Sequence, residues 1–596
     1  MNNKVNLKID DVSIQVEEGK TVLEAARELN IHIPTLCHHE DLCVAGNCRV
    51  CVVEQKGARG LVASCAMPVS DGMEINTNSL KVRNARKHII ELLLSEHNEK
   101  CTTCYKNGKC ELQNLAAEYK IEGERFIDLV PFKDYAMDMM SPSIIKDDSK
   151  CIRCQRCVRT CEELQHVSAL GVAYKGSEMK ISTFFENSMF DVVCTNCGQC
   201  VNRCPTGALV EKNYIDQVFD AIYDSGKHVV VQTAPATRIA LGEDLGMEPG
   251  NVVTGKMVSA LRRLGFDSVL DTDFTADLTI IEEGNELLTR LKKVLVDNDP
   301  AVKIPMTTSC SPGWIKFIEH TFPQFLDNVS TCKSPQQMFG ALAKTYYAQK
   351  RGINPEDIIS VSVMPCTAKK FEADRPEMTD SGYKDVDYVL TTRELAIMVK
   401  QAGIQFDTLE ESHYDSIMGE STGAAVIFGA TGGVMEAALR TAYEVVTGRN
   451  VPFEALNIMP VRGMEGVREA SVRIADPLPD WKFLDGVEVK TVVAHGLTNA
   501  KKVMQMVQDG TANYHFIEIM ACPGGCLGGG GQPIPTNADI RQKRSDAIYQ
   551  ADMDMPIRKS HENPEIKMIY EDFLGQPLGH KSHELLHTHY KERARY

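Results

Sequence analysis

The stretch CTNCGQCVNRCP at residues 194–205 decides how the first third of this chain is organised, and a near copy, CIRCQRCVRTC, lies at residues 151–161. Proteins with two [4Fe–4S] clusters use this C-x2-C-x2-C-x3-C spacing, in which three thiolates bind one cube and the fourth reaches the other. A pair of zinc sites or disulfides is the alternative. We predict two adjacent clusters that carry electrons, with the ligands Cys151, Cys154, Cys157, Cys161, Cys194, Cys197, Cys200 and Cys204.

A further cysteine group lies near the N-terminus. Residues 4–16 alternate polar and apolar about Asp10 and Asp11, which predicts a hairpin, and residues 20–30 predict a short helix capped by Thr21. The spacing C-x10-C-x2-C-x13-C follows, and hairpin, helix and cysteine loop together indicate a β-grasp domain with one [2Fe–2S] cluster. A zinc site is the alternative. The predicted ligands are Cys37, Cys48, Cys51 and Cys65.

A helix predicted over residues 81–96 leads into the pattern H-x3-C-x2-C-x5-C. Taken alone, one histidine and three cysteines fit structural zinc as well as iron. Because iron–sulfur patterns lie on both sides, we expect a [4Fe–4S] cluster, and its imidazole ligand should raise the reduction potential. The predicted ligands are His97, Cys101, Cys104 and Cys110.

Composition limits the class of protein. The chain has 596 residues, too many for one domain, and its net charge of −16 argues against nucleic acid and anionic membranes as partners. The 21 cysteines lie in tight groups, unlike a disulfide framework. No apolar run reaches the ~20 residues of a membrane span, and the N-terminus lacks the apolar segment of an export signal. We therefore predict a cytoplasmic protein without a membrane span.

After residue 213 cysteines become sparse, and apolar segments alternate with helical ones. This alternation predicts an α/β region with largely parallel strands, arranged as two lobes around a cleft. The segments predicted as strands are 228–234, 268–272, 278–284, 358–366 and 424–433.

Three cysteine-bearing segments interrupt this region: TTSCSPGW (307–314), VMPCTAKKFE (363–372) and EIMACPGGCLGGGGQP (518–533). The glycines of the third let the backbone approach a bulky group, although a phosphate-binding loop is the alternative. With the four accessory groups, these segments resemble the signature motifs of [FeFe]-hydrogenases over essentially the whole chain. The resemblance implies interconversion of protons, electrons and H₂ at an H-cluster, a [4Fe–4S] cube joined to a di-iron site with CO, CN⁻ and azadithiolate ligands.

The resemblance also gives a domain organisation. It implies a β-grasp [2Fe–2S] ferredoxin domain at 1–80 and a His/Cys3 [4Fe–4S] domain at 81–140. A ferredoxin-type domain with two [4Fe–4S] clusters is expected at 141–212, and the H-cluster catalytic domain at 213–596. The iron–sulfur domains before the α/β region are expected to be small α+β units.

Motif position assigns the H-cluster ligands. Cys366, Cys522 and Cys526 are implied ligands of the cube, with Cys526 as the bridge to the di-iron site. The family's first motif has two adjacent cysteines, a proton relay and then a cube ligand, whereas here Cys310 is followed by Ser311. Either Ser311 or another group completes the cube, or Cys310 binds it and another group relays protons. We expect Cys310 to be the relay.

The resemblance extends to the surroundings of the di-iron site. Lys369 is expected to donate a hydrogen bond to a cyanide. Backbone and side-chain groups around the other diatomic ligands are implied at Ala234, Pro235, Ser334, Met364 and Met520; from the residues alone, the methionines fit core packing equally well.

A proton path is implied at Glu283, Ser330 and Glu286. Spacing alone places both glutamates on one helical face, where solvated acids are the ordinary interpretation. Carboxyl, hydroxyl and thiol groups at hydrogen-bond spacing suffice to pass protons between the surface and Cys310.

Partners follow from the resemblance as well. H₂ and protons are the implied substrates, and ferredoxin or flavin-, NAD(P)- and [2Fe–2S]-binding subunits are the implied electron partners. The alternative is an electron-wiring subunit of a complex I- or formate dehydrogenase-like assembly, which CPGGCLGGGGQP argues against. The segment GATGG (429–433) has neither the spacing nor the lysine of a nucleotide-binding loop.

Overall fold

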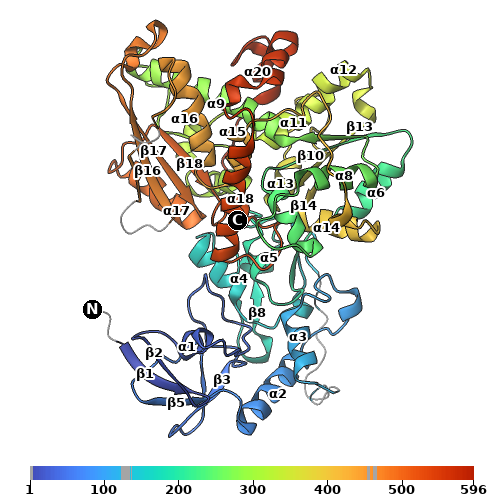
Figure 1. Cartoon of the computed structure of the whole chain (residues 1–596), viewed down its shortest axis with the longest axis vertical. Coiled ribbons are helices and arrows are strands. Elements are labelled where there is room, and N and C mark those ends of the chain that lie inside the picture. Colours follow the sequence, from blue (N-terminus) through green and yellow to red (C-terminus); the bar gives the residue numbers. More distant parts are fainter. Residues whose placement is uncertain are drawn as a thin grey trace.

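The computed structural model describes residues 4–122, 126, 135, 137–452, 457–460 and 466–595, with residues 457–460 described by their backbone alone. Figure 1 shows the β-grasp unit at one end of the long axis and two catalytic sheets at the other. Between them lie α4 (Arg156–Arg159) and α5 (Gln199–Arg203). Among the described residues, no helix combines the length and the apolar character needed to cross a membrane.

The first unit confirms the predicted hairpin and helix. Asp10 and Asp11 turn the hairpin at φ values of 47° and 66°, and Thr21 caps α1 (Val22–Glu28) in a capping box with Glu24. The sheet order is β2-β1-β5-β3-β4. Its strands are β1 (Lys4–Ile9), β2 (Val12–Glu17), β3 (Val52–Gln55), β4 (Leu61–Ala63) and β5 (Met73–Asn76).

Two small units follow. The predicted helix over 81–96 is α2 (Leu80–Leu94), and α3 (Glu111–Glu118) begins directly after the last cysteine of the His97 group. The unit with the double cysteine motif holds two short antiparallel ribbons besides α4 and α5. They pair β6 (Ile144–Lys146) with β9 (Leu209–Glu211) and β7 (Gly171–Ala173) with β8 (Lys180–Ser182).

The first catalytic sheet is parallel throughout, as predicted, in the order β11-β10-β13-β14. Helices cover both faces, so its strands are apolar runs. The strands are β10 (His228–Thr233), β11 (Ser268–Asp271), β13 (Ile358–Met364) and β14 (Tyr388–Thr391). One face packs on α6 (Ile215–Tyr223), α8 (Thr254–Leu264) and α14 (Thr392–Gln401), and the other on α9 (Thr272–Leu295) and α11 (Pro335–Leu342).

The second catalytic sheet is mixed, which corrects the expectation of two parallel sheets. The strand order is β12-β18-β17-β16-β15. The strands β12, β18 and β17 pair in parallel, whereas β16 pairs antiparallel with both β17 and β15. A short 3₁₀ turn joins β16 to β17, so no covering helix forces a parallel crossover. The strands are β12 (Met306–Thr307), β15 (Asn457–Pro460), β16 (Val467–Arg473), β17 (Glu488–His495) and β18 (Phe516–Met520).

Two predicted strands are wrong. Residues 278–284 lie inside the 24-residue helix α9, and residues 424–433 form α15 (Gly423–Val426) and a 3₁₀ turn. Both segments are buried on nearly all sides. Residues 278–284 belong to α9, which packs against the first sheet and against α16 (Gly433–Thr447), and residues 424–428 pack between α9 and α16. A helix buried all round has no polar face, so its sequence cannot be told from a buried strand.

The remaining helices hold the lobes together. α10 (Pro312–Thr321) and α17 (Leu497–Gln508) pack on one face of the second sheet. In Figure 1, α18 (Ala538–Asp554) runs between the two sheets. The other short helices are α7 (Thr237–Ala240), α12 (Ala348–Arg351), α13 (Ala368–Ala373), α19 (Pro564–Ile569) and α20 (His580–Leu586).

Candidate metal centre and its electron and proton connections

A buried cavity lies where strands of both catalytic sheets end. Ala234 follows β10, Cys310 follows β12, Cys366 follows β13 and Cys522 follows β18. Ligand sites form at the carboxyl ends of parallel strands, and two sheets here contribute to one site. The cavity has about 840 Å³ of empty space, including the part open to solvent. All the predicted ligand and pocket residues of the H-cluster line it, except Ser334.

Three thiols meet in this cavity. Burial raises the pKa of Cys366, Cys522 and Cys526, to about 12 for Cys526. Such thiols become thiolates only where a cation compensates their charge, so an iron cluster fits this donor set. Ser311 lies beside them, and its Oγ accepts a hydrogen bond from the backbone N–H of Ala521 at 3.2 Å.

Glycine lets the third motif close against its neighbours. At Gly525 φ is +79°, and a Cβ would lie 2.8 Å from the backbone nitrogen of Thr431. Thr431 belongs to GATGG, so this segment packs against the CPGGC loop. The buried Glu518 carboxylate fixes the segment, accepting hydrogen bonds from the backbone N–H groups of Gly432 and Met435 at 2.7 Å each.

Exchangeable groups lead away from the cavity along α9. Burial and the nearby Glu283 raise the pKa of the Cys310 thiol. Burial and then the charge of Glu286 raise the pKa of Glu283 to about 8. Ser330 Oγ donates to Glu286 Oε2 at 2.8 Å, and Arg290 Nη2 donates to Glu286 Oε1 at 2.6 Å. The structure therefore brings the predicted path residues together.

Lys369 reaches the cavity wall and is held there. Its ammonium donates to Glu372 Oε2 at 2.8 Å, and the same oxygen accepts from Ser334 Oγ at 2.8 Å and Gln336 Nε2 at 3.1 Å. Among the residues that the structure describes, Gln336 lines the cavity, whereas Ser334 does not line it and instead holds Glu372 through its hydroxyl.

The N-terminal cysteines also converge. The sulfur atoms of Cys51 and Cys65 lie 3.3 Å apart. Hydrogen bonds with Cys48 and Cys65 lower the pKa of Cys37 to about 2. The four predicted ligands of a [2Fe–2S] cluster thus form one group.

The His97 group is similarly assembled. Burial lowers the pKa of His97 to about 4, and its Nδ1 has no hydrogen-bond partner within the described part of the chain. His97 lines a small cavity with Cys101 and Cys110, and Cys104 adds to the effect of burial in raising the pKa of both thiols. A neutral imidazole with a free buried nitrogen fits a metal ligand.

The double motif is folded crosswise. After burial, the charges of Cys194 and Cys197 contribute most to raising the pKa of Cys161. Cys204 acts in the same way on Cys151 and Cys154. The fourth cysteine of each run therefore lies with the first three of the other run, as its spacing predicts.

The second ferredoxin group touches the catalytic cavity. Cys197 is part of the cavity wall, and a Cβ on Gly530 would lie 2.2 Å from the carbonyl oxygen of Cys197. Gln199 Nε2 donates to the carbonyl oxygen of Gly528 at 2.8 Å, and Thr367 Oγ1 donates to that of Asn196 at 2.7 Å. This cysteine group therefore contacts the cavity wall directly.

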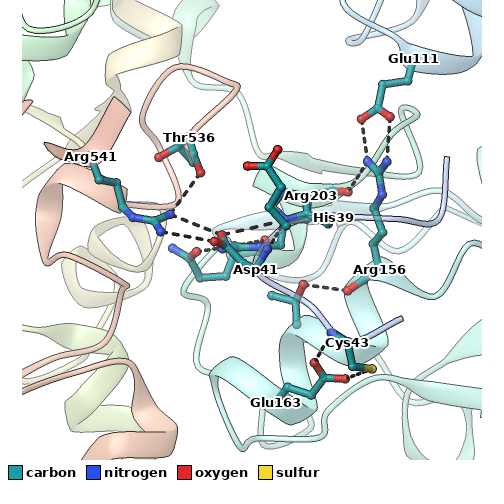
Figure 2. A network of polar contacts seen from close by, with 12 residues as sticks. His39, Asp41, Cys43, Glu111, Arg156, Glu163, Arg203, Thr536 and Arg541 are labelled. Atoms are coloured by element: carbon teal, nitrogen blue, oxygen red, sulfur yellow. Dashed lines mark hydrogen bonds and ion pairs between the residues drawn. The ribbon is translucent and has the colours of Figure 1, made fainter. Parts of the chain in front are cut away.

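Figure 2 shows a polar network that joins three domains at Asp41. Arg203 Nη2, from α5, donates to Asp41 Oδ2 at 2.5 Å, and Arg541 Nη2, from α18, donates to Asp41 Oδ1 at 3.3 Å. Burial raises the pKa of Asp41, but the two guanidinium groups outweigh it and the pKa is lowered. In the same network Arg159 donates to the carbonyl oxygen of Cys37 at 2.5 Å.

Sequence reasoning missed several residues of this site. Arg290 stands four residues after Glu286, a spacing that could have suggested the ion pair. Gln336 and Phe428 line the cavity, and Asp41 joins the domains, but each comes from a separate segment without a local motif.

Comparison with known families identifies the class of protein. Residues 227–530 match the family described as "Iron only hydrogenase large subunit, C-terminal domain", and residues 538–593 match "Iron hydrogenase small subunit". Three N-terminal matches are a 2Fe-2S iron-sulfur cluster binding domain (2–79), an NADH-ubiquinone oxidoreductase-G iron-sulfur binding region (86–125) and an NADH-quinone oxidoreductase subunit 3 ferredoxin-like domain (141–210). The chain belongs to the iron-only, or [FeFe], hydrogenase family.

Individual relatives agree. The chain is 52% identical to the NADP-reducing hydrogenase subunit HndD of Solidesulfovibrio fructosivorans, covering 99% of both chains. It is 41% identical to iron hydrogenase 1 of Clostridium pasteurianum over 98% of this chain and 99% of that one. The structure of apo [FeFe]-hydrogenase HydA1 from Chlamydomonas reinhardtii matches 64% of this chain and 100% of its own, at 45% identity and a TM-score of 0.58. The chain is a hydrogenase with an H-cluster domain and accessory iron–sulfur domains.

Proposed function

We propose that this chain is the catalytic subunit of an NADP-linked hydrogenase that carries one [2Fe–2S] cluster, three [4Fe–4S] clusters and an H-cluster. The observation that carries the proposal is the convergence of Cys366, Cys522 and Cys526 in one buried cavity whose wall includes Cys197. The N-terminal family matches to NADH oxidoreductase regions and the similarity to HndD support the link to a pyridine nucleotide.

The cluster ligands are the groups named in the sequence analysis. Cys366, Cys522 and Cys526 would hold the cube of the H-cluster, and Cys526 would be the bridging ligand. When bound, the H-cluster supplies the reversible chemistry that joins two protons and two electrons into H₂. Lys369, held by Glu372, would offer its ammonium to a cyanide ligand. Gln336 lines the cavity, whereas the Ser334 hydroxyl donates to Glu372. Ala234, Pro235, Met364 and Met520 form the rest of the enclosure.

The neighbours of Cys310 and Ser311 support Cys310 as the proton relay. The Cys310 side chain packs in the cluster that contains Ile280 and Met520, on the α9 side, where Glu283 acts on its pKa. Ser311 instead contacts the backbone beside Cys522. Ser311 would therefore occupy the fourth position at the cube, and Cys310 would exchange protons with Glu283.

Protons then move through this chain's own groups. Glu283 holds its proton near neutral pH because burial and Glu286 raise its pKa to about 8. Ser330 donates to Glu286 and can pass a proton between the two carboxyls. Arg290 keeps Glu286 in place.

Electrons enter by two branches that meet at the ferredoxin unit. Asn47, in the [2Fe–2S] loop, donates to the carbonyl oxygen of Cys154 at 3.4 Å. From the His97 group, Cys104 Sγ lies so close to Gly207 that a Cβ there would stand 2.6 Å away. Cys197, in the cavity wall, would hold the cluster nearest to the H-cluster. We place the domain boundaries at 1–80, 81–140, 141–212 and 213–596.

The electron partners are flavin-, NADP- and [2Fe–2S]-binding subunits, with ferredoxin as a further donor or acceptor, and the complex works in the cytoplasm. Native purification of the tagged chain tests this. We expect roughly 20 iron atoms per chain and H₂-dependent NADP⁺ reduction by the complex, and no NADP⁺ reduction by the isolated chain. A native complex without flavin that exchanges electrons with ferredoxin alone would contradict the NADP link. If the His97 group holds zinc and His97→Cys leaves every redox signal unchanged, the protein has one [4Fe–4S] cluster fewer than we propose.

A further inference from the structure

Glu286 is the last carboxyl of the proposed path, and the Arg290 guanidinium binds its Oε1 oxygen. The guanidinium donates five hydrogen bonds, two to Glu286 Oε1 and the others to the backbone carbonyl oxygens of Lys303, Asp327 and Val329. A guanidinium has five N–H groups, so all of them are used. A proton that leaves past Arg290 requires several charge-assisted bonds to break together.

The other oxygen of Glu286 faces a second set of groups. Glu286 Oε2 accepts from Ser330 Oγ at 2.8 Å and from the Cys332 thiol at 3.8 Å. A ring nitrogen of His587 lies within 4.8 Å of a Glu286 carboxylate oxygen and of the Cys332 sulfur. One bridging water spans such a separation. The side of Glu286 opposite Arg290 therefore faces a group that can take up a proton.

The C-terminal segment holds His587 in this place. Cys332 and His587 form an isolated antiparallel bridge, and the Thr331 hydroxyl lies 2.8 Å from His587 Nδ1. His587 Nε2 lies 3.2 Å from Glu282 Oε2, a buried carboxylate that also accepts from Tyr570 at 2.5 Å. Glu282 gives the ring a counter-charge when the ring carries a proton.

His583 packs against this buried ring and is itself exposed to solvent. The ring centroids of His583 and His587 lie 4.3 Å apart; His583 is exposed and His587 is buried. The titratable groups that act on His583 are His587, Glu282, Glu286 and His589. Imidazoles pass protons readily near neutral pH.

We propose that His587 and His583 form a second branch of the proton path, which connects Glu286 to solvent on the side away from Arg290. The proposal rests on the place of Glu286 in the proposed path. In H₂ oxidation the Glu286 carboxylic acid gives its proton to neutral His587, which leaves a carboxylate and an imidazolium. The imidazolium passes the proton through His583 to solvent, and Glu286 is protonated again from Glu283 through Ser330. H₂ formation runs the same steps in reverse.

Three variants of the loaded holoenzyme test the branch: His583→Ala, His587→Gln and, as the matched control, His580→Ala, which removes an exposed histidine of the same helix. H₂ evolution is measured with excess reduced donor in weak buffer, with and without imidazole. We expect His583→Ala to lower turnover about 3-fold and imidazole to restore it, because imidazole can replace an exposed proton carrier. His587→Gln should lower turnover about 5-fold without rescue, since its site is buried.

Two further readouts separate a relay from a structural contact. Infrared CO and CN⁻ bands and the melting temperature should match wild type in His583→Ala and His580→Ala. Wild-type turnover of His583→Ala in weak buffer would overturn the branch, and so would a loss in His587→Gln that only follows a lower melting temperature. Glu283→Gln is measured in parallel. If it keeps full turnover, the proposed path itself fails; if it loses turnover while both histidine variants remain normal, the branch alone fails.

Discussion

The accessory region and the catalytic region arrange their predicted iron-binding residues in opposite ways along the chain. The His97 group lies within residues 97–110, and the crosswise ferredoxin pair lies within 151–204. The cavity thiols instead follow strands of two different sheets, at Cys366 and Cys522. Short-range spacing therefore determines the accessory sites, whereas the catalytic site exists only where the two lobes pack together. Substitutions in the two regions should therefore have different consequences for cofactor assembly and turnover.

The largest effect is expected in the catalytic cavity. Cys310→Ala should lower turnover by roughly 10³-fold while the infrared CO and CN⁻ bands persist, because the substitution removes a proton relay but no ligand of the cluster. Cys310→Asp should recover part of the activity. Ser311→Cys should shift the potential of the cube and keep turnover. Loss of the bands in Cys310→Ala, with an unchanged spectrum in Ser311→Cys, would show that Cys310 is the ligand.

One step further from the cavity, Glu283→Gln should lower turnover about 100-fold, because the amide cannot carry a proton. The pKa of Glu283 is about 8, so the wild-type carboxyl is protonated at pH 7 and ionises as the pH rises through 8. Wild-type H₂ evolution should therefore fall above that pH, whereas the residual activity of the variant should lack this step. A pH profile of turnover measures both, and the same step in the variant would assign it to another group.

In the accessory region, Cys194→Ala should lower electron delivery from an external donor about 10-fold or more by removing a cluster ligand. The infrared bands of the H-cluster should remain, since the cavity ligands belong to other segments. Cys43→Ala is the matched control, because Cys43 is an exposed thiol outside the predicted ligand sets. Missing infrared bands in Cys194→Ala would show that the two regions do not assemble independently.

The smallest effect is expected where the two regions meet, and it should appear in stability. Asp41→Asn should destabilise the docked state by about 2 kcal/mol, because Arg203 and Arg541 lose their partner charge. The pKa of Asp41 is lowered in the folded protein, so its contribution is present above the unfolded value near 3.8 and is lost as the pH falls below it. Thermal unfolding from pH 3 to 7 measures this. The control Glu40→Gln, an exposed ion pair with Arg27, should change stability by less than about 0.5 kcal/mol.

Features that depend on residues close together in the sequence could be predicted. The hairpin about Asp10, the Thr21 cap and the crosswise cysteine runs follow from spacing and turn chemistry. Sequence reasoning failed at 278–284 and 424–433, where burial on all sides removes the periodicity that separates a helix from a strand. In the site, the thiols could be named from their motifs. Gln336 and Asp41 could not, because their partners lie in distant segments that only packing brings near.

The Asp41–Arg541 contact joins residues 500 positions apart, and this separation orders the assembly of the chain in time. The entropy of closing so long a loop exceeds that of a tenfold shorter one by only about 2 kcal/mol, so distance along the chain does not prevent docking. During synthesis, however, residue 41 emerges long before α18, so the N-terminal domain must wait for that helix before the contact can form. The N-terminal domain therefore docks fully only on a chain in which α18 has already been made.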